Sequence, residues 1–426
     1  MGAIIGKLCS ADGFFKSTNI KDNPATLLVQ GMTKPNSPLS RATVSRSLKR
    51  TQSTLTIDID NLFKNSELPG EDSPRSSLIT SIASDHKITE NDFEFRDLLG
   101  TGGYSRVYLA HQKGNMENGL IFAIKTISKI QFKKEEWNQF LTELKILAVV
   151  SCTPCQFLTH LYCSFQSDFN LYFCLEYVPG GSLRKYLDLK HTFDLNCTTF
   201  VAAEILIGIL YLHKKLQIFH RDLKPENVLI DEEGHCKLTD FGLSAIGKIE
   251  AYSFCGTFNY LAPEMINKKG YSNLVDFWML GCIIYEMLVG KPPFSYKNKK
   301  TMLDMINSGC YRSNLIADPV ARDIVSKLLV VEPKYRLGAK GSNEILKHAF
   351  FKGTSFKMLI RKQIESPLKP FVTITKVDET LVNDPNLIQE ELEMQIASKR
   401  PKLERFSWIK CRKVPSKMDD DDFLEQ

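Results

Sequence analysis

The chain changes its hydrophobic pattern once, and this change limits most strongly what it can fold into. Four short runs rich in aromatic and β-branched residues begin at Phe93 and predict strands: FEFRDLLG, RVYLAHQ, LIFAIKTI and LYFCLEYV. An amphipathic helix is predicted between them, over Glu135 to Val150. Long helical patterns follow the turn residues Pro179 to Gly181. This segregation predicts an α+β, bilobal fold, a small β-rich lobe before a larger helical lobe, with a ligand cleft between them.

The two ends of the chain differ from this middle part. Residues 1–90 are rich in Ser, Thr, Asn and Pro without a sustained period, which predicts a mostly disordered regulatory extension. Within it, Lys34 to Thr54 holds cations and hydroxyls but no acid, and it reads equally as a phosphorylated arm or as a solvated linker. After Phe351 a tail is expected, residues 352–426, with scattered prolines and an acidic end.

Composition and charge exclude several classes of protein. Hydrophobic residues make up 43% of the 426 residues and charged residues 24%, as in an ordinary soluble globular protein. The net charge of +6 is modest and the basic residues are scattered, so no nucleic-acid partner is expected. The 11 cysteines suggest no disulfide framework and no secretory signal opens the chain. A reducing location is therefore expected, the cytoplasm first and the nucleus second.

Neither a zinc site nor a membrane span is expected. Cys152 and Cys155 form one CxxC pair, but no second pair follows to complete four ligands. The longest apolar runs, such as residues 204–212, fall short of the roughly 18 residues that a span needs. Membrane contact is expected only if Gly2 or Cys9 carries a lipid, and a single lipid would bind weakly.

A glycine loop, GTGGYSRV, runs from Gly100 to Val107 between the first two predicted strands. Glycines let backbone amides approach phosphate oxygens without a Cβ in the way. Its place between two strands favours a flap over a nucleotide, with an ordinary hairpin turn as the alternative. Lys125 in FAIK could reach the phosphates, and Glu143 on the predicted helix is the carboxylate expected to pair with it.

The octet HRDLKPEN, His220 to Asn227, concentrates charged and amide side chains. Asp222 would accept or orient the proton of an attacking hydroxyl, while Lys224 would neutralise charge on a transferring phosphoryl group. Asn227 would offer an amide oxygen to a magnesium ion, and Asp240 in DFG would supply a carboxylate to it. With APE at 262–264, the order and spacing predict a phosphoryl-transfer centre.

These motifs resemble the eukaryotic protein kinase family from about Phe93 to Phe351, and LKPEN is similar to its serine/threonine type. The resemblance implies ATP and Mg²⁺ as cofactors and protein Ser or Thr hydroxyls as acceptors. It implies Leu175 as the gatekeeper and a hinge from Glu176 to Val178 whose backbone meets adenine. The nucleotide-binding residues that it implies are Leu99, Gly100, Gly102, Gly103, Val107, Ala123, Lys125, Glu176 and Val178.

The same resemblance implies structural roles in the helical lobe. His220 is expected to be an anchor, Arg221 to gather a phosphorylated activation loop, and Asp276 to brace the catalytic loop. A salt bridge between Glu264 and Arg336 is expected inside this lobe.

Finer features resemble the AGC group, and within it most resemble the kinases that phosphorylate ribosomal proteins. They are SFCGTFNYLAPE (253–264), YRLGAKG (335–341) and SPLKPFV (366–372). Ser253 then matches the activation-loop phosphosite, which implies an upstream activating kinase. In LERFSW, Ser407 matches the phosphosite of a hydrophobic motif near 403–408, whose aromatics would dock beside the helix carrying Glu143. An unattached amphipathic stub is the alternative.

Some positions depart from the family pattern. Ser105 replaces the third glycine of the loop, which predicts reduced but not abolished activity. Glu226 and Glu286 match two acids that grip a substrate arginine upstream of the acceptor, but Ser182 stands where a third acid is usual. A preference for upstream arginine is therefore left open.

The main interpretation is an active, monomeric kinase switched by phosphate on Ser253 and Ser407. A pseudokinase scaffold, which would bind partners without catalysis, is the rival from another class. The catalytic and metal-binding set speaks against that rival because Lys125, Asp222, Asn227 and Asp240 are all intact.

Overall fold

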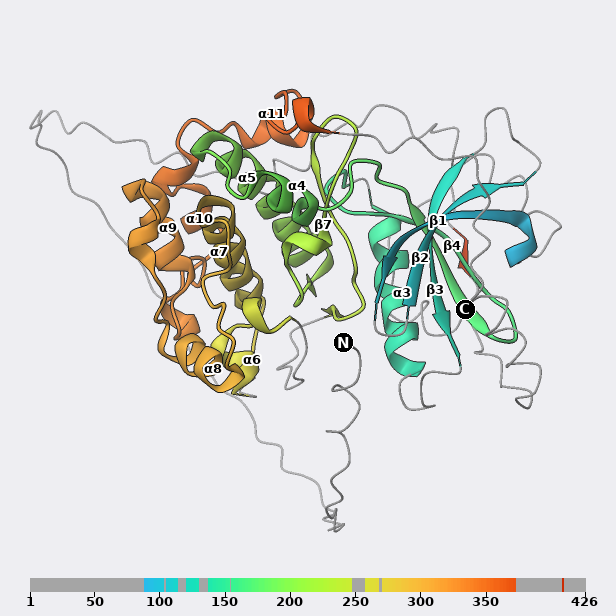
Figure 1. Ribbon diagram of the computed structural model, residues 1–426, viewed down its shortest axis with the longest axis horizontal. Helices are drawn as coiled ribbons and strands as arrows, with labels where there is room; N and C mark the ends of the chain where they lie inside the picture. Colours follow the sequence, from blue (N-terminus) through green and yellow to red (C-terminus); the bar gives the residue numbers. More distant parts are fainter. Residues whose placement is uncertain are drawn as a thin grey trace, which may run out of the picture. The chain divides into compact units, whose positions relative to one another are not determined.

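The computed structural model describes residues 88–102, 105–113, 120–129, 137–153, 155–246, 257–267, 270–372 and 408–409. A β-rich lobe comes first and a helical lobe follows it (Figure 1), so the expected bilobal α+β fold is confirmed. The predicted extension, up to residue 87, and most of the predicted tail after residue 372 lie outside the described residues.

The first lobe is built on one antiparallel sheet with the strand order β1-β2-β3-β5-β4-β10. Its strands are β1 (Phe93–Thr101), β2 (Ser105–Gln112), β3 (Ile121–Ser128), β4 (Leu161–Gln166), β5 (Asn170–Glu176) and β10 (Trp408–Ile409). The last of these comes from the far end of the chain and pairs with β4. The sheet therefore joins the predicted small lobe to the region of the predicted hydrophobic motif.

Strand β3 places Lys125 by the two-residue alternation of side chains. Phe122 and Ile124 are buried in a cluster on one face of the sheet, so Lys125 points to the other. Helix α3 (Trp137–Ser151) lies beside the sheet (Figure 1) and contacts β4. Its residues Phe140 and Leu144 are buried. The helix predicted over Glu135 to Val150 is thus present, beginning at the first residue that the structure describes there.

The second lobe is mainly helical, as the sequence predicts. Its helices are α4 (Leu183–Lys190), α5 (Leu195–Tyr211), α6 (Pro263–Ile266), α7 (Leu274–Val289), α8 (Lys299–Ser308), α9 (Pro319–Leu328), α10 (Asn343–Leu346) and α11 (Phe356–Ile360). Helix α7 lies between α5 and α9 and contacts both. Asp194 starts α5 by accepting a hydrogen bond from the Cys197 amide, and Gly290, at φ 83°, ends α7.

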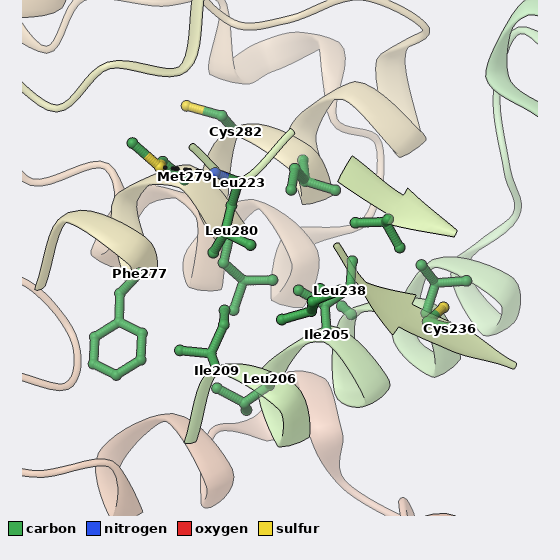
Figure 2. Packing of buried hydrophobic residues seen from close by; sticks show 14 of the residues in the cluster. Ile205, Leu206, Ile209, Leu223, Cys236, Leu238, Phe277, Met279, Leu280 and Cys282 are labelled. Carbon is green, nitrogen blue, oxygen red and sulfur yellow. Dashed lines mark hydrogen bonds between the residues drawn. The ribbon is translucent and has the colours of Figure 1, made fainter. Parts of the chain in front are cut away.

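The core of this lobe fixes the catalytic loop. Figure 2 shows Ile205 and Ile209 of α5 near Leu280 of α7, all fully buried. Leu223, between Asp222 and Lys224, is buried in the same cluster, and its backbone amide lies 3.3 Å from the Met279 sulfur. Burial of Leu223 therefore turns its two charged neighbours away from the core.

Two short pairs of antiparallel strands bring separate motifs together. β6 (Ile218–Phe219) pairs with β9 (Ala245–Ile246), and β7 (Val228–Ile230) pairs with β8 (Cys236–Leu238). HRDLKPEN lies between β6 and β7, and DFG lies between β8 and β9. The two pairings consequently hold the two motifs side by side.

Packed structure continues past the predicted domain end at Phe351. The Lys362 ammonium lies 2.6 Å from the Asp231 carboxylate, and the Ser366 hydroxyl donates to the Gly234 carbonyl at 2.6 Å. Both partners belong to the turn between β7 and β8. The start of the tail is thereby attached to the helical lobe.

One helical segment among the described residues, Leu195–Leu216, is long and apolar enough to cross a membrane. It has a mean hydropathy of 1.8 and is longer than the apolar run at 204–212 that the sequence suggested. However, 83% of its most apolar window is buried inside the protein, as in the core helix of a globular lobe.

Candidate active site

Two acidic side chains, one from α3 and one from DFG, meet at Lys125. Its ammonium lies 2.6 Å from the carboxylate of Glu143 and 3.1 Å from that of Asp240. The Glu143 side chain is nearly buried, whereas that of Asp240 is 46% exposed. The ion pair that the sequence predicts is present, and Lys125 also links the sheet of the first lobe to DFG.

Lys125 and Asp240 stabilise each other's charge, whereas burial raises the pKa of Glu143. Burial by itself would lower the pKa of Lys125, but the carboxylates of Asp240 and Glu143 raise it above its usual range. The charge of Lys125 in turn lowers the pKa of Asp240. Lys125 therefore stays a cation and Asp240 an anion at neutral pH, as the binding of phosphates and a divalent cation requires.

The carboxylate of Asp222 is held from two sides. Lys224 lies 2.7 Å from one of its oxygens, and the Thr257 backbone amide donates to the other at 3.0 Å. Lys224 also donates to the Thr257 hydroxyl at 2.7 Å. Asp222 and Lys224, predicted to act together on the reacting groups, are thus in direct contact.

Asn227 and Asp240 lie in adjacent segments. The Asn227 side-chain nitrogen donates to the Asp222 carbonyl at 2.8 Å and to its carboxylate at 3.1 Å. The backbone amide of Thr239, the residue before Asp240, donates to the Asn227 carbonyl at 3.0 Å. Since both side-chain bonds of Asn227 use its nitrogen, its amide oxygen is the atom that suits a cation.

These side chains fit a magnesium site that phosphates complete. Among the described residues, no group of three or more His, Cys, Asp and Glu side chains is placed to hold a metal. Mg²⁺ is usually bound through one or two protein ligands together with substrate phosphates and water. Asn227 and Asp240, the second of which contacts Lys125, are a donor set of that kind.

The backbone around these residues is held in an uncommon conformation. Arg221 and Asp240 have φ values of 68° and 63°, in the left-handed region. The buried Asp276 accepts hydrogen bonds from the amides of His220 at 2.9 Å and Arg221 at 2.8 Å. Burial opposes ionisation of Asp276, but hydrogen bonding and charge from His213 lower its pKa below the usual range. Asp276 therefore braces the catalytic loop as an anion, in the position that the family resemblance implies.

His220 and Arg221 connect this loop to DFG. The His220 ring nitrogen lies 3.0 Å from the Thr239 carbonyl oxygen, and the ring packs against Phe241. The Arg221 guanidinium donates to the carbonyls of Leu243 and Ser244. His220 is thus placed as the expected anchor, and Arg221 holds the start of the segment that follows DFG.

Glu264 and Arg336 form the expected ion pair inside the helical lobe. The two guanidinium nitrogens lie 2.7 and 2.9 Å from the two carboxylate oxygens, and both side chains are buried. The pair ties the APE segment to the chain between α9 and α10.

The expected nucleotide-binding residues share one region of the sheet. Val107 pairs with Lys125, and Ala123 pairs with Leu175, so these side chains lie on one face. Within the glycine loop, the Gly102 amide donates to the Ser105 carbonyl at 2.6 Å. The remaining expected residues are Gly100 and an exposed Leu99 at the end of β1, and a buried Val178 after β5. Gly103 lies outside the described residues.

At the predicted hinge, the carboxylate of Glu176 contacts two basic side chains. Lys237 lies 2.9 Å and His160 3.3 Å from its two oxygens. Burial opposes ionisation, but these partners lower the pKa of Glu176. The carboxylate therefore holds the hinge in place, and the Glu176 backbone amide donates to the His160 carbonyl at 2.8 Å.

Sequence reasoning missed two residues at this site. Thr257 holds Asp222, and Arg184 bridges Glu226 and Glu286. All three contacts span more than 30 residues of sequence, so no local pattern reveals them. The predicted phosphosites Ser253 and Ser407 lie outside the described residues.

Comparisons with known proteins agree with this geometry. Residues 93–351 match the family model of the protein kinase domain. Protein kinase 3 of Dictyostelium discoideum is 37% identical over 332 residues, which cover 74% of this chain and 36% of that protein. Ribosomal protein S6 kinase beta of Caenorhabditis elegans is 36% identical over 289 residues, covering 67% of this chain and 52% of that one.

The matched segments span a third to a half of the length of these two relatives. A probable serine/threonine-protein kinase of Dictyostelium discoideum is matched more fully, at 34% identity over 84% of this chain and 79% of that protein. The match to the protein kinase family model covers more than half of the chain and includes every residue of the site described above. The chain therefore belongs to the eukaryotic protein kinase family and is AGC-like within it.

Proposed function

We propose that the chain is a serine/threonine protein kinase that uses ATP and Mg²⁺. The observation that carries the proposal is the convergence of Lys125, Asp222, Asn227 and Asp240, described above, from both lobes. A network of ion pairs that only stabilised the fold would not need the amide of Asn227 together with the carboxylates of Asp222 and Asp240. The names of the relatives, which include a probable serine/threonine-protein kinase, support serine and threonine as acceptors.

The proposed reaction moves the γ-phosphoryl group of ATP to a protein hydroxyl. The bond from the γ-phosphorus to the leaving ADP oxygen breaks, a bond to the acceptor oxygen forms, and Asp222 takes the hydroxyl proton. Lys224 stands beside Asp222 and offsets charge on the phosphoryl oxygens. Lys125 orients the phosphates of ATP, and Asn227 and Asp240 would hold Mg²⁺, which shields the phosphate charge when bound.

The experiment is transfer of labelled phosphate from ATP to a library of Ser- and Thr-containing peptides. Wild type is compared with Asp222→Asn and Lys125→Met. Loss of a proton-handling group should lower the rate by about a hundred- to ten-thousand-fold. If wild type and both variants give the same trace signal, the chain is a scaffold that binds partners without catalysis.

Regulation by phosphorylation on Ser253 and Ser407 is a further part of the proposal. The proposal for Ser253 is supported by Arg221, whose guanidinium donates to the carbonyl of Ser244, nine residues before Ser253 in the sequence. Strand β10 begins directly after Ser407 and pairs with β4, which connects the tail to the first lobe. Ser253→Ala and Ser407→Ala should each lower the activity that an added upstream kinase produces; unchanged activation would exclude that site.

A monomer in the cytoplasm completes the proposal. Eight cysteines in the described part of the chain are free thiols, which suits a reducing location. Light scattering should report the mass of one chain, and a tagged chain should separate with the cytoplasmic fraction. Recovery with membranes that depends on Gly2 or Cys9 would indicate lipid attachment instead.

A further inference from the structure

Arg184 makes a contact with every nitrogen of its guanidinium. Its Nε lies 2.8 Å from Glu226, its Nη1 2.9 Å from Glu286, and its Nη2 donates to the Tyr260 hydroxyl at 2.9 Å. The same Tyr260 hydroxyl donates to Glu286. One arginine of the chain therefore connects two carboxylates that come from different parts of the helical lobe.

This cluster lies beside the proposed acceptor site. Glu226 belongs to the catalytic loop, four residues after Asp222 and next to Asn227. Tyr260 follows Thr257, whose backbone amide holds the Asp222 carboxylate. Both chain segments that position Asp222 thus also supply groups to the cluster, so a substrate whose hydroxyl reaches Asp222 passes close to it.

The cluster is partly open to solvent. The Glu226 side chain is 45% exposed and that of Arg184 25%, whereas Glu286 is buried. Without Arg184, two carboxylates would face the substrate, one of them buried and uncompensated, and such a pair attracts a cationic side chain strongly. With Arg184 in place, its positive charge offsets one of the two negative charges and uses the oxygens that would bind a guanidinium.

We infer that Arg184 occupies, from within the chain, an arginine-binding site for the protein substrate, so that this kinase does not select substrates with an upstream arginine. The inference deepens the proposed function and rests on it. Arg184 sits in the first turn of α4, which is fixed by buried Leu183, Tyr186 and Leu187. An internal group of this kind has an effective concentration of about millimolar or higher, so an arginine on a dilute substrate does not displace it.

The test removes Arg184 and asks whether a substrate arginine takes its place. A peptide with one acceptor serine carries a single arginine, which is moved through the upstream positions against an alanine background. For wild type, kcat/KM for arginine and alanine peptides should agree within about threefold at every position. For Arg184→Ala, the arginine peptide should be favoured by about tenfold or more at one position, through a lower KM.

Matched variants separate this specificity role from a merely structural one. Lys185→Ala removes a cation from the same helix and should leave every ratio as in wild type. Arg184→Lys keeps the charge but cannot bridge both carboxylates and Tyr260, so it should give a smaller gain; it also serves if Arg184→Ala does not fold. Glu226→Gln added to Arg184→Ala should abolish the gain. A wild type that already prefers arginine by about tenfold, or unchanged ratios in folded Arg184→Ala and Arg184→Lys, would overturn the inference.

A second measurement does not depend on catalysis. Guanidinium chloride at millimolar concentration should raise the Tm of Arg184→Ala relative to the same concentration of sodium chloride, and should not raise that of wild type. If wild type transfers no phosphate to any peptide, the proposed function fails. The guanidinium measurement still decides whether Arg184 occupies a guanidinium-binding site formed by Glu226 and Glu286. No stabilisation of Arg184→Ala by guanidinium would show that the two carboxylates do not form such a site.

Discussion

Lys125 and Glu143 are joined by an ion pair of 2.6 Å that connects strand β3 to helix α3. Glu143 is nearly buried there, and Lys125 reaches onward to Asp240 at 3.1 Å. The position of the ammonium therefore depends on how α3 sits against the sheet. If α3 moved away, Asp240 would be the remaining carboxylate bound to Lys125. Asp240 would then compete with the phosphates of ATP for the Lys125 ammonium.

Glu143→Gln should lower kcat for peptide phosphorylation by about a hundredfold, because small displacements of a positioning group have effects of that size. Binding of ATP should weaken much less, since Lys125 itself remains. Steady-state kinetics with varied ATP measures both effects. Lys145→Gln, an exposed charge change on the same helix, is the control and should behave as wild type. A glutamine variant with unchanged kcat would contradict the role of the pair.

Glu264→Gln should lower the free energy of unfolding by about 3–5 kcal/mol, because it leaves the buried Arg336 guanidinium without its counter-ion. Urea unfolding at neutral pH measures this loss. The control is Lys327→Gln, which removes an exposed pair with Asp323 and should change stability by about 0.5 kcal/mol or less. A loss in Glu264→Gln no larger than in the control would mean that the carbonyls bonded to Arg336 compensate its charge alone.

Much of the fold could be predicted from the sequence, for local reasons. The alternation in β3 and the three- and four-residue spacing in α3 are properties of contiguous segments, so strands and helices could be read directly. The attachment of residues 352–372 could not, since Lys362 and Ser366 contact Asp231 and Gly234 more than 130 residues earlier. The family resemblance implies that the segment near 403–408 docks beside the helix carrying Glu143, but it does not imply that β10 pairs with β4, which is far away in the sequence.

The site divides in the same way. Asp222, Lys224 and Asn227 share one loop and belong to a specific motif, so their residue types and spacing were sufficient to predict that they lie together in a site. Arg184 belongs to no such motif, and although Thr257 lies within SFCGTFNYLAPE, that motif does not reveal which residue Thr257 contacts. The contacts of Arg184 with Glu226 and of Thr257 with Asp222 arise only when α4 and the segment around Thr257 pack against the loop. Side chains that act across elements are therefore the part of a site that a single sequence hides.

Asp276→Asn should reduce the dependence of stability on acid. The Asp276 pKa is lower in the folded protein than the value of about 3.9 in an unfolded chain. An ionised Asp276 thus stabilises the fold above that value, and this contribution is lost as pH falls through the folded pKa. Wild type should be more stable than Asp276→Asn by about 3–5 kcal/mol at neutral pH.

The difference between these two proteins should shrink as pH falls from about 5 toward about 2, which urea unfolding at several pH values measures. Asp304→Asn, at an exposed position in α8, is the control and should follow wild type throughout. A difference between wild type and Asp276→Asn that stays constant over this range would contradict an ionised Asp276 as the brace of the catalytic loop.

Gly234 and Gly353 provide a matched test of how the tail is attached. Both have left-handed backbone, at φ 86° and 91°, so alanine is strained by a similar amount, about 1 kcal/mol, at either position. At Gly353 an added Cβ meets nothing within 4 Å, whereas at Gly234 it would lie 2.6 Å from the Lys369 backbone nitrogen and 2.8 Å from the Ser366 hydroxyl.

Gly234→Ala should therefore lower the free energy of unfolding by about 1–3 kcal/mol more than Gly353→Ala, because the tail must move away from the β7–β8 turn. Urea unfolding measures the difference, and limited proteolysis should cut after residue 360 faster in Gly234→Ala only. Since Lys362 and Ser366 bond to this turn, the same variant should expose the backbone between them to hydrogen exchange. Equal effects of the two alanines on stability and cleavage would mean that the tail rests on this turn without being held by it.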